Sequence, residues 1–575
     1  MKLSYYTFKW SVTACLITLV AASCSSQKEK SELPSGDFNV SIRSVKFTDD
    51  DNVVTVNTNK TSESSDKLSA TTNTANQRAQ ASSGIQRTNE FDFSTDLMTN
   101  ALAGDQVKSI KASTTGNGKL RAADVPLGGN KKFRLIFMQD GNSTPVYNGL
   151  LSAGEDPQLK VAANKKYFWY AISINDPNTA PNIDGSGNIA ASELTNKDFM
   201  FASGEITTKE DANYLDIIFL RQMAAINVTF NTRGIFGGIT DNSTFSIGSG
   251  TGSSFTNIIQ TGTFSIFNGS FSNFQDTDPI KGSEMTVVDS RWGNAEKTAL
   301  FYSANTSTSI PANNLRVRLN ALGINLDDGT VRNFSANTIV PIANGSALAL
   351  TKGTLSKTNV RLIESGINVG GVIWARTNLI YDTNKLYGSS YTRGSSDAYR
   401  FRTNNEYAHP NANIEFWNFG TATPTGTGYA TVDPCSRVYP ESTWRLPQEL
   451  NNPKEMTNLA NNTNWNNSIK AVADGYRHSR IWTGSQAANP AYPDNNLILS
   501  YYGYRATNGT VQQQPSGNNG TGWLLFQSNE YSANNNNSKL LHSKVNNGTF
   551  GANSIETVSY GNGTTIRCVR SIVNN

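Results

Sequence analysis

The sequence is poor in charged residues, and its positive charges do not cluster. Only 16% of the 575 residues are Asp, Glu, Lys or Arg, and the formal net charge at pH 7 is +4. Because the Lys and Arg residues are scattered and form no basic face, we expect no nucleic acid among the partners. Asn, Thr, Ser and Gly are abundant instead, which is typical of the hydrated, uncharged surface of a secreted β protein.

Apolar runs that could span a membrane are also absent after the N-terminus, since no later stretch has about 18 apolar residues in a row. At the N-terminus, Lys2 and Lys9 precede the apolar run Trp10–Val20 and a few small residues. This pattern predicts a secretory signal over residues 1–23. Cys24, directly after the small residues, predicts a lipoprotein signal whose acyl chains anchor the mature chain in the outer membrane. A plain signal peptide with a chance cysteine is the alternative.

Cysteine is scarce, with four in the whole chain. Cys15 and Cys24 belong to the signal, so Cys435 and Cys568 are the remaining pair. In an oxidising compartment, two lone cysteines in one domain most simply form a disulfide. The disulfide would close a loop of more than about 130 residues. In the chain-entropy model such a loop adds on the order of 4–5 kcal/mol to the free energy of unfolding. A metal pair or a reactive thiol is the alternative, but no neighbouring Cys or His has metal-ligand spacing.

Signatures of catalysis are missing as well. The sequence has no Gly-x-Ser-x-Gly elbow, His-Glu-x-x-His motif, phosphate loop or dinucleotide fingerprint. Its three histidines, His409, His478 and His542, stand alone in the sequence. We therefore expect no enzyme activity, with an enzyme acting on polysaccharide as the weakest alternative.

Short apolar segments with β-branched and aromatic residues recur along the chain, separated by Gly, Asn and Asp turns. This pattern predicts a mainly β protein with two β-sandwich domains followed by an α+β domain. We expect a signal peptide (1–23), a tether (24–35), a first sandwich (36–222) with a mobile loop (58–90), a second sandwich (223–365) and a C-terminal domain (366–575).

One segment matches the register of a 12-residue calcium loop. Asn182, Asp184, Ser186 and Glu193 bring oxygen side chains to positions 1, 3, 5 and 12, with Gly187 at position 6. Position 1 is Asn rather than Asp, and only two of the four side chains are charged. An ordinary Gly/Asn surface loop is therefore the favoured interpretation, and no other cofactor is expected.

Residues 132–175 and 198–232 resemble the fimbrillin-like proteins of type V pili. The resemblance lies in the Tyr-x-Trp-Tyr-Ala strand at Tyr167–Ala171 and the Arg-x-Met-Ala-x-Ile strand at Arg221–Ile226. It implies a fimbrillin-like N-terminal sandwich. In that family an arginine-specific protease removes the first strand, and a strand of another subunit fills the groove.

The last 210 residues resemble a lectin-like module related to the C-type lectin fold and to a paralogous domain of fibre-degrading bacteria. The resemblance lies in the segment 371–379, in Trp444-Arg-Leu-Pro447, in Ile481–Ser485 and in Ile566–Arg570. It implies the same Cys435–Cys568 disulfide. The triplets that bind sugar through calcium in such lectins are missing. Exposed aromatics are therefore the candidate contacts for a sugar or a protein ligand, namely Trp417, Tyr501, Tyr502, Tyr504 and Trp523.

Together the two resemblances imply a subunit at or near the tip of a type V fimbria, on the outer membrane and in the fimbrium, that mediates cell adhesion and biofilm formation. Its partners would be other fimbrial subunits, through strand complementation, and a host or bacterial surface ligand. Residues 38–47 are the candidate first strand, and Arg78, Arg87 or Arg43 the candidate cut. The alternative is an outer-membrane lipoprotein that binds glycan for nutrient uptake.

Overall fold

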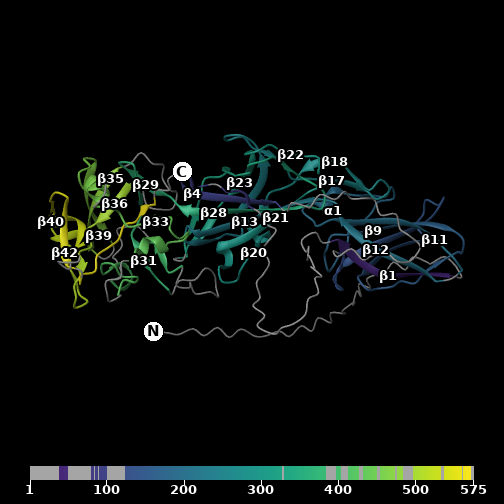
Figure 1. Ribbon diagram of the computed structural model, residues 1–575, viewed down its shortest axis with the longest axis horizontal. Coiled ribbons are helices and arrows are strands. Elements are labelled where there is room, and N and C mark those ends of the chain that lie inside the picture. Colours follow the sequence, from purple (N-terminus) through teal and green to yellow (C-terminus); the bar gives the residue numbers. More distant parts are fainter. Residues whose placement is uncertain are drawn as a thin grey trace, which may run out of the picture.

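The computed structural model describes residues 38–48, 79–82, 84–88, 90–99, 124–210, 212–326, 329–383, 397–402, 412–425, 432–449, 454–472, 475–483, 496–532, 537–559 and 561–571. Strands predominate there, which confirms the mainly β prediction; the α-helices of this part are short, α1 (Ala191–Leu194), α2 (Ala412–Glu415) and α3 (Glu455–Ala460). No helix among these residues is long and apolar enough to cross a membrane. Three regions follow one another along an elongated molecule (Figure 1).

The first region is built on an eight-stranded sheet that encloses its own core. The strand order is β5-β1-β12-β11-β9-β6-β7, with β8 paired to β1. β11 and β12 pair over only two residues each. Side chains from β1 and β12 and from β6, β9 and β11 nevertheless pack in one core. The strands are β1 (Phe38–Thr48), β5 (Asp124–Pro126), β6 (Lys132–Gln139), β7 (Tyr147–Ser152), β8 (Leu159–Val161), β9 (Lys166–Ser173), β11 (Met200–Thr207) and β12 (Asn213–Arg221).

β1 is an integral part of this core although it is the most N-terminal described strand. It runs parallel to β12, from Val40 opposite Asn213 to Phe47 opposite Phe219. Val40 is fully buried, and Phe47 packs against the same core. Arg43 is skipped in the register, so β1 carries a bulge that changes the spacing of its inward side chains.

The second region is a sandwich of two sheets. The larger has the order β2-β4-β28-β13-β21-β20, with β3 also on β4, and the smaller has the order β16-β15-β23-β26, with β19 on β15. One apolar core joins their inner faces. The larger sheet contains β2 (Ala79–Ser82), β3 (Gln86–Arg87), β4 (Phe91–Thr99), β13 (Ala224–Gly234), β20 (Thr286–Val287), β21 (Glu296–Ser303) and β28 (Leu355–Glu364). The smaller contains β15 (Thr244–Ser249), β16 (Thr256–Asn257), β19 (Ile280–Lys281), β23 (Leu315–Ala321) and β26 (Thr338–Pro341).

Shorter strands complete the second region. They form the sheet β14-β24-β25 and the pair β22-β27. Their bounds are β14 (Gly237–Ile239), β22 (Ser309–Ile310), β24 (Gly323–Leu326), β25 (Val331–Asn333) and β27 (Leu348–Ala349).

The strands β2, β3 and β4 correct the expected domain ranges. We expected residues 36–222 to form the first sandwich and residues 58–90 to be a mobile loop. Instead β4 pairs with β28 of the second region along its whole length, and β2 and β3 form a hairpin with β4. The alternation of Phe91, Phe93 and Leu97 places these side chains in the second core, which makes β4 a core strand.

The first and second regions are joined by a shared core and a small sheet. β10 (Asn188–Ile189) pairs with β17 (Gln260–Ser265), which pairs with β18 (Ser270–Asp276). Around them Ile189 and Leu194 from the first region pack with Phe264 and Ile266 from the second. The calcium-loop segment thus contributes a strand and a helix to this junction.

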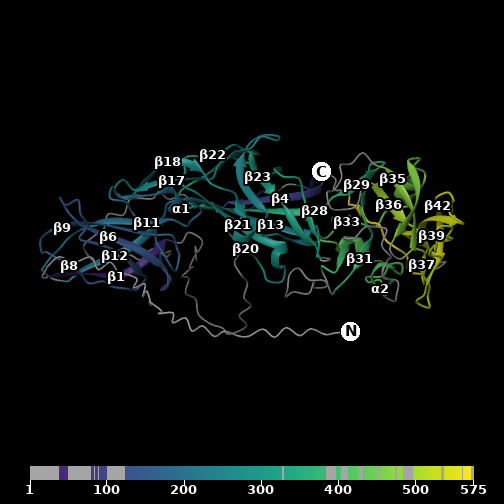
Figure 2. The same cartoon turned by 180° about the vertical axis from the view of Figure 1, so that it is seen from behind.

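The C-terminal region contains several small sheets and two cores. Its helices α2 and α3 have four and six residues, so helix contributes little to this expected α+β domain. The strands are β29 (Gly366–Val369), β30 (Val372–Ala375), β31 (Leu379–Tyr381), β32 (Tyr399–Phe401), β33 (Trp444–Arg445), β34 (Trp465–Val472), β35 (Gly475–Thr483), β36 (Asn496–Ser500), β37 (Tyr504–Arg505), β38 (Val511–Gln512), β39 (Gly522–Ser532), β40 (Asn537–Asn546), β41 (Thr549–Phe550), β42 (Ser554–Ser559) and β43 (Val569–Arg570). β39, β40 and β42 lie at the end of the molecule that is remote from β1 (Figures 1 and 2).

Candidate functional site

Three of the five candidate ligand-contact aromatics are buried, which corrects the prediction for them. Trp417 is fully buried, and its indole Nε1 donates to the carbonyl of Leu379 at 3.3 Å. Tyr501 and Tyr502 are 2% and 1% exposed. Their rings belong to the packed interior of the C-terminal region, so they do not reach a ligand outside it.

Tyr504 and Trp523 are the two candidates that lie at the surface. Both are half-buried, and their rings stack with centroids 5.5 Å apart and planes inclined by 27°. Trp523 lies directly across the β39–β40 ladder from the exposed Lys544, whose ammonium is 5.5 Å from the indole centroid. The hydroxyl of Tyr504 donates to the amide oxygen of Gln512 at 2.9 Å. We call these four residues the aromatic platform.

The backbone beneath the platform is fixed by hydrogen bonds. The N–H of Gly503 donates to the carbonyl of Trp523 at 2.9 Å, and the N–H of Trp523 donates to the carbonyl of Gln513 at 2.8 Å. Gly503 has φ +73°, and a Cβ there would lie 1.9 Å from the carbonyl oxygen of Gln512. Only glycine fits this close approach, so the platform is held in place before any ligand arrives.

His542 packs against the Trp523 ring of the platform. Its ring lies perpendicular to that of Trp523, with centroids 5.6 Å apart, and its Nδ1 is 2.7 Å from a carboxylate oxygen of Glu556. Burial lowers the pKa of His542, and the nearby Glu556 carboxylate only partly offsets this effect. His542 is therefore neutral at pH 7.

Burial also lowers the pKa of His478, whose Nε2 donates to the carbonyl of Asn518 at 3.1 Å. Both histidines accept protons more readily when the chain is unfolded, so the stability that they contribute is present above their ordinary pKa and lost as pH falls below it. We expect the unfolding midpoint of the C-terminal region to decrease between pH 7.5 and pH 5. In a His478→Gln/His542→Gln variant, calorimetry should show a smaller decrease; an unchanged decrease would contradict this assignment.

The predicted disulfide is present and closes a long loop of the C-terminal region. Cys435 and Cys568 are fully buried and bonded, across 133 residues of sequence. We expect the double variant Cys435→Ser/Cys568→Ser to lose on the order of 4 kcal/mol in the free energy of unfolding of this region. Denaturant unfolding followed by tryptophan fluorescence measures the loss, and an unchanged midpoint would contradict it.

The calcium-loop residues do not converge on a cation site. The amide oxygen of Asn182 accepts from the guanidinium of Arg134 at 3.0 Å, which brings a positive charge to the first ligand position. The carboxylate of Asp184 accepts the backbone N–H of Ser186 at 2.8 Å, and Glu193 accepts from the Asn182 amide at 3.3 Å. In the described ranges, no three His, Cys, Asp or Glu side chains are grouped as a metal would need. The segment serves the junction between the first two regions.

The candidate processing arginines have different surroundings. Arg43 lies within β1, where its Nε donates to the carboxylate of Asp216 at 3.0 Å. Arg87 is exposed but lies in the β3–β4 hairpin, opposite Asp92. Arg78, like the lipidation residue Cys24, falls outside the described residues.

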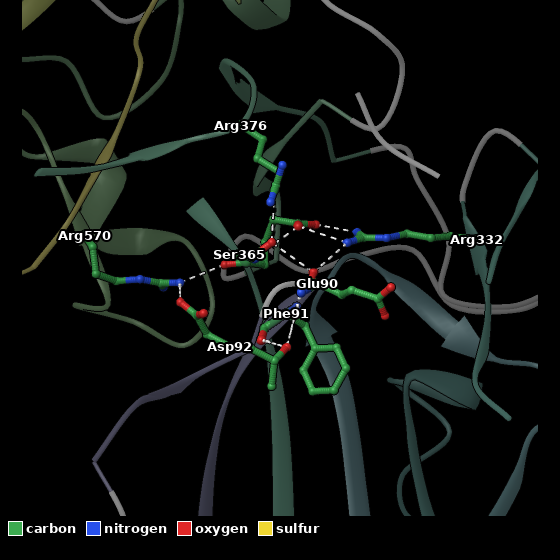
Figure 3. A network of polar contacts seen from close by, with 9 residues as sticks. Glu90, Phe91, Asp92, Arg332, Ser365, Arg376 and Arg570 are labelled. Atoms are coloured by element: carbon green, nitrogen blue, oxygen red, sulfur yellow. Dashed lines mark hydrogen bonds and ion pairs between the residues drawn. The ribbon is translucent and has the colours of Figure 1, made fainter. Parts of the chain in front are cut away.

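The C-terminal region is bound to the second region by a buried polar network (Figure 3). The guanidinium of Arg570 forms an ion pair with Asp92 of β4 and donates to the carbonyl of Glu364 at 2.7 Å. The same guanidinium carbon lies 3.9 Å from the ring centroid of Trp444. Asp92 is 2% exposed, and burial raises its pKa against the opposing effect of Arg570.

A second set of bonds extends this network. Arg332 pairs with Glu364, with Nη1 and Oε2 2.5 Å apart, and Arg376 donates to the hydroxyl of Ser365 at 3.0 Å. That hydroxyl donates in turn to the carbonyl of Glu90 at 2.9 Å. Hydrogen bonds therefore connect the turn that leads into β4 to the start of the C-terminal region (Figure 3).

Sequence reasoning missed this junction and the platform residues Lys544 and Gln512. Arg570 and Asp92 are separated by 478 residues, and no local pattern marks such a pair. Lys544 becomes informative only through the strand register that puts it opposite Trp523.

Comparison with known proteins gave no family model and no curated protein that matches this chain. Solved structures give weak likenesses. A Bacteroides fragilis protein provisionally called a cell adhesion protein is 15% identical, with coverage of 47% of this chain and 97% of its own and a TM-score of 0.28. A fimbrial assembly protein of Parabacteroides distasonis is 11% identical, with coverage of 42% and 86% and a TM-score of 0.22. These scores are too low to transfer a fold or a function.

Proposed function

We propose that this chain is an adhesive subunit at or near the tip of a surface fibre of the type V fimbrial kind, assembled by strand exchange. The proposal rests on the position of strand β1 in the first region. This strand supplies buried side chains to the first core, yet the chain joins it to β2 only through residues 49–78. A cut in that segment would leave β1 held by noncovalent contacts alone.

The outer edge of β1 is incompletely paired, which favours its replacement by another strand. β8 pairs with residues 38–40 of β1 and β5 with residues 46–48. Between them the N–H of Ile42 donates to the carboxylate of Asp156 at 3.2 Å, a side-chain bond in place of a ladder bond. A strand with a similar apolar pattern would form the same bonds to β12 when inserted from a neighbouring subunit.

The surroundings of Arg43 and Arg87 disfavour both as the cut, so the proposal takes Arg78. Cleavage after Arg43 would divide a paired strand. Cleavage after Arg87 would break the hairpin turn, where the hydroxyl of Thr88 accepts the N–H of Phe91 at 3.1 Å. Cleavage after Arg78 would free β1 and leave the hairpin of β2, β3 and β4 intact. Proteases act on backbone that is free of such bonds, which disfavours Arg43 and Arg87.

The other end of the molecule fits contact with a ligand. The aromatic platform lies in the C-terminal region, whose strands β39 and β40 are remote from β1 (Figure 1). In this proposal the first sheet binds the fibre, the platform faces a host or bacterial surface, and the buried junctions keep the two ends apart. Cell adhesion and biofilm formation would follow from this arrangement.

The proposal predicts which arginine is required for fibre entry. Cells expressing Arg78→Ala should retain an unprocessed, Cys24-acylated chain in the outer membrane and lose it from sheared fibres. The matched variant Arg87→Ala should be processed and incorporated like the natural chain. Immunoblots of both fractions, with the N-terminus determined, measure this.

If neither variant alters the distribution and all chains stay acylated in the membrane, the proposal is wrong. A membrane-retained lipoprotein that binds glycan for nutrient uptake then becomes the leading account.

A further inference from the structure

In the described part of the C-terminal region, few large apolar side chains are exposed apart from the platform. Of the large apolar side chains that are clearly exposed in the described part of the chain, only Tyr476 and Val511 belong to this region. A stable protein–protein interface buries about 800 Å² of surface on each partner, and its centre is apolar. The exposed apolar side chains of this region are too few to form such a centre. The platform is instead a small aromatic surface with a polar rim, which suits a single ring-shaped group.

Stacked aromatic rings with amide and charged groups at their edge are suited to sugar rings, which present C–H bonds on a face and hydroxyl groups at the rim. Gln512 provides the amide beside Tyr504. His542, whose ring packs against that of Trp523, is 3% exposed, and within the described residues its Nε2 has no hydrogen-bond partner. A buried, unsatisfied ring nitrogen next to an aromatic surface marks a place for a further polar group or a bridging water.

The charge at the rim is positive. Lys544 is exposed, and among the described residues its ammonium forms no ion pair, only the contact with the Trp523 ring. The carboxylate of Glu556 on β42 is hydrogen-bonded to the neutral His542 ring and not to Lys544. The platform therefore combines a stacking surface with a cation that forms no ion pair among the described residues.

We propose that the aromatic platform binds a carboxylate-bearing glycan, with a sugar ring against Tyr504 and Trp523 and the carboxylate at Lys544. This inference rests on the proposed function in one respect, namely that the platform is the surface that meets the ligand. Its test does not depend on processing or strand exchange, so each can fail without the other.

The test uses the mature full-length chain in detergent and isothermal titration with two matched pairs of probes. Tri-galacturonate is compared with its methyl ester, and 3′-sialyllactose with its methyl ester. Within each pair the probes differ only in the carboxylate charge, and each pair represents one source of acidic sugar. We expect one acidic probe to bind about three- to fivefold more tightly than its neutral partner, as for an exposed ion pair.

Variants separate the two parts of the platform. Lys544→Gln should abolish the preference for the acidic probe, because it removes the cation without disturbing a buried group. Trp523→Ala and Tyr504→Ala should weaken binding of both probes of the pair by about tenfold or more. Tyr214→Ala, which removes an aromatic ring that is 54% exposed in the first region, is the control and should bind normally.

Three results would overturn the proposal. They are no binding of either acidic probe at millimolar concentration, equal binding of acidic and neutral probes, and unchanged binding by Trp523→Ala and Tyr504→Ala variants. Unfolding midpoints of the variants are measured alongside, and Lys544→Gln keeps the charge test valid if an aromatic variant does not fold.

Discussion

A chain from which β1 has been removed is expected to lose the fold of its first region. Residues 38–48 place Val40 and Val45 in the core, and Phe38, Ile42 and Phe47 pack against it. Each such side chain contributes about 1.5–3 kcal/mol on burial, whereas a whole domain is stable by only about 5–15 kcal/mol. The deletion should therefore abolish the unfolding transition of this region in calorimetry, while the transition of the C-terminal region remains.

A synthetic peptide with the sequence of residues 38–48 should restore the lost transition when added to the shortened chain. A control peptide in which Val40 and Val45 are replaced by Asp should not, because each carboxylate would enter the apolar core unpaired. If the shortened chain keeps the complete set of transitions without any peptide, β1 is dispensable and the acceptor groove is not formed by its loss.

The variant Arg570→Met is expected to destabilise the C-terminal junction by about 3–5 kcal/mol, because it leaves the buried carboxylate of Asp92 without its partner. Methionine keeps much of the apolar contact with Trp444. Asp92 would then be neutralised by proton uptake, and its pKa would rise further above the ordinary value. Since a raised pKa in the folded state favours the fold at low pH, the loss of stability should be smaller at pH 5 than at pH 8.

Two matched variants test the cause. Asp92→Asn combined with Arg570→Met removes both charges and should recover a large part of the lost stability. Glu205→Gln, which breaks the exposed pair with Lys166, should change the unfolding midpoint little. If Arg570→Met and Glu205→Gln have equal effects, the junction does not depend on the buried pair.

The sequence predicted those features that local patterns encode. Short apolar segments with β-branched and aromatic residues indicated β1 and β9, and two lone cysteines indicated the Cys435–Cys568 bond. The position of β4 was not predictable in this way, because its partner β28 lies more than 250 residues away. Its alternation of Phe91, Phe93 and Leu97 indicates a strand but not the sheet to which the strand belongs.

The aromatic residues show the same limit. Trp417, Tyr501 and Trp523 look equivalent in the sequence, since each is a large ring in a Gly- and Asn-rich region. Only tertiary packing distinguishes the buried rings of Trp417 and Tyr501 from the half-exposed ring of Trp523. An aromatic side chain supports either a core or a binding surface, so composition alone assigns neither role.

The most direct test of strand exchange is a photo-cross-linking amino acid in place of Tyr214. This side chain is exposed and lies opposite Ser41 in the β1–β12 pair, so it reports which strand occupies the position of β1. In chains from the membrane fraction, the account predicts cross-links to residues 38–48 of the same chain. In chains from sheared fibres it predicts cross-links to a peptide of a different subunit, identified by mass spectrometry; cross-links to residues 38–48 of the same chain in that fraction would contradict it.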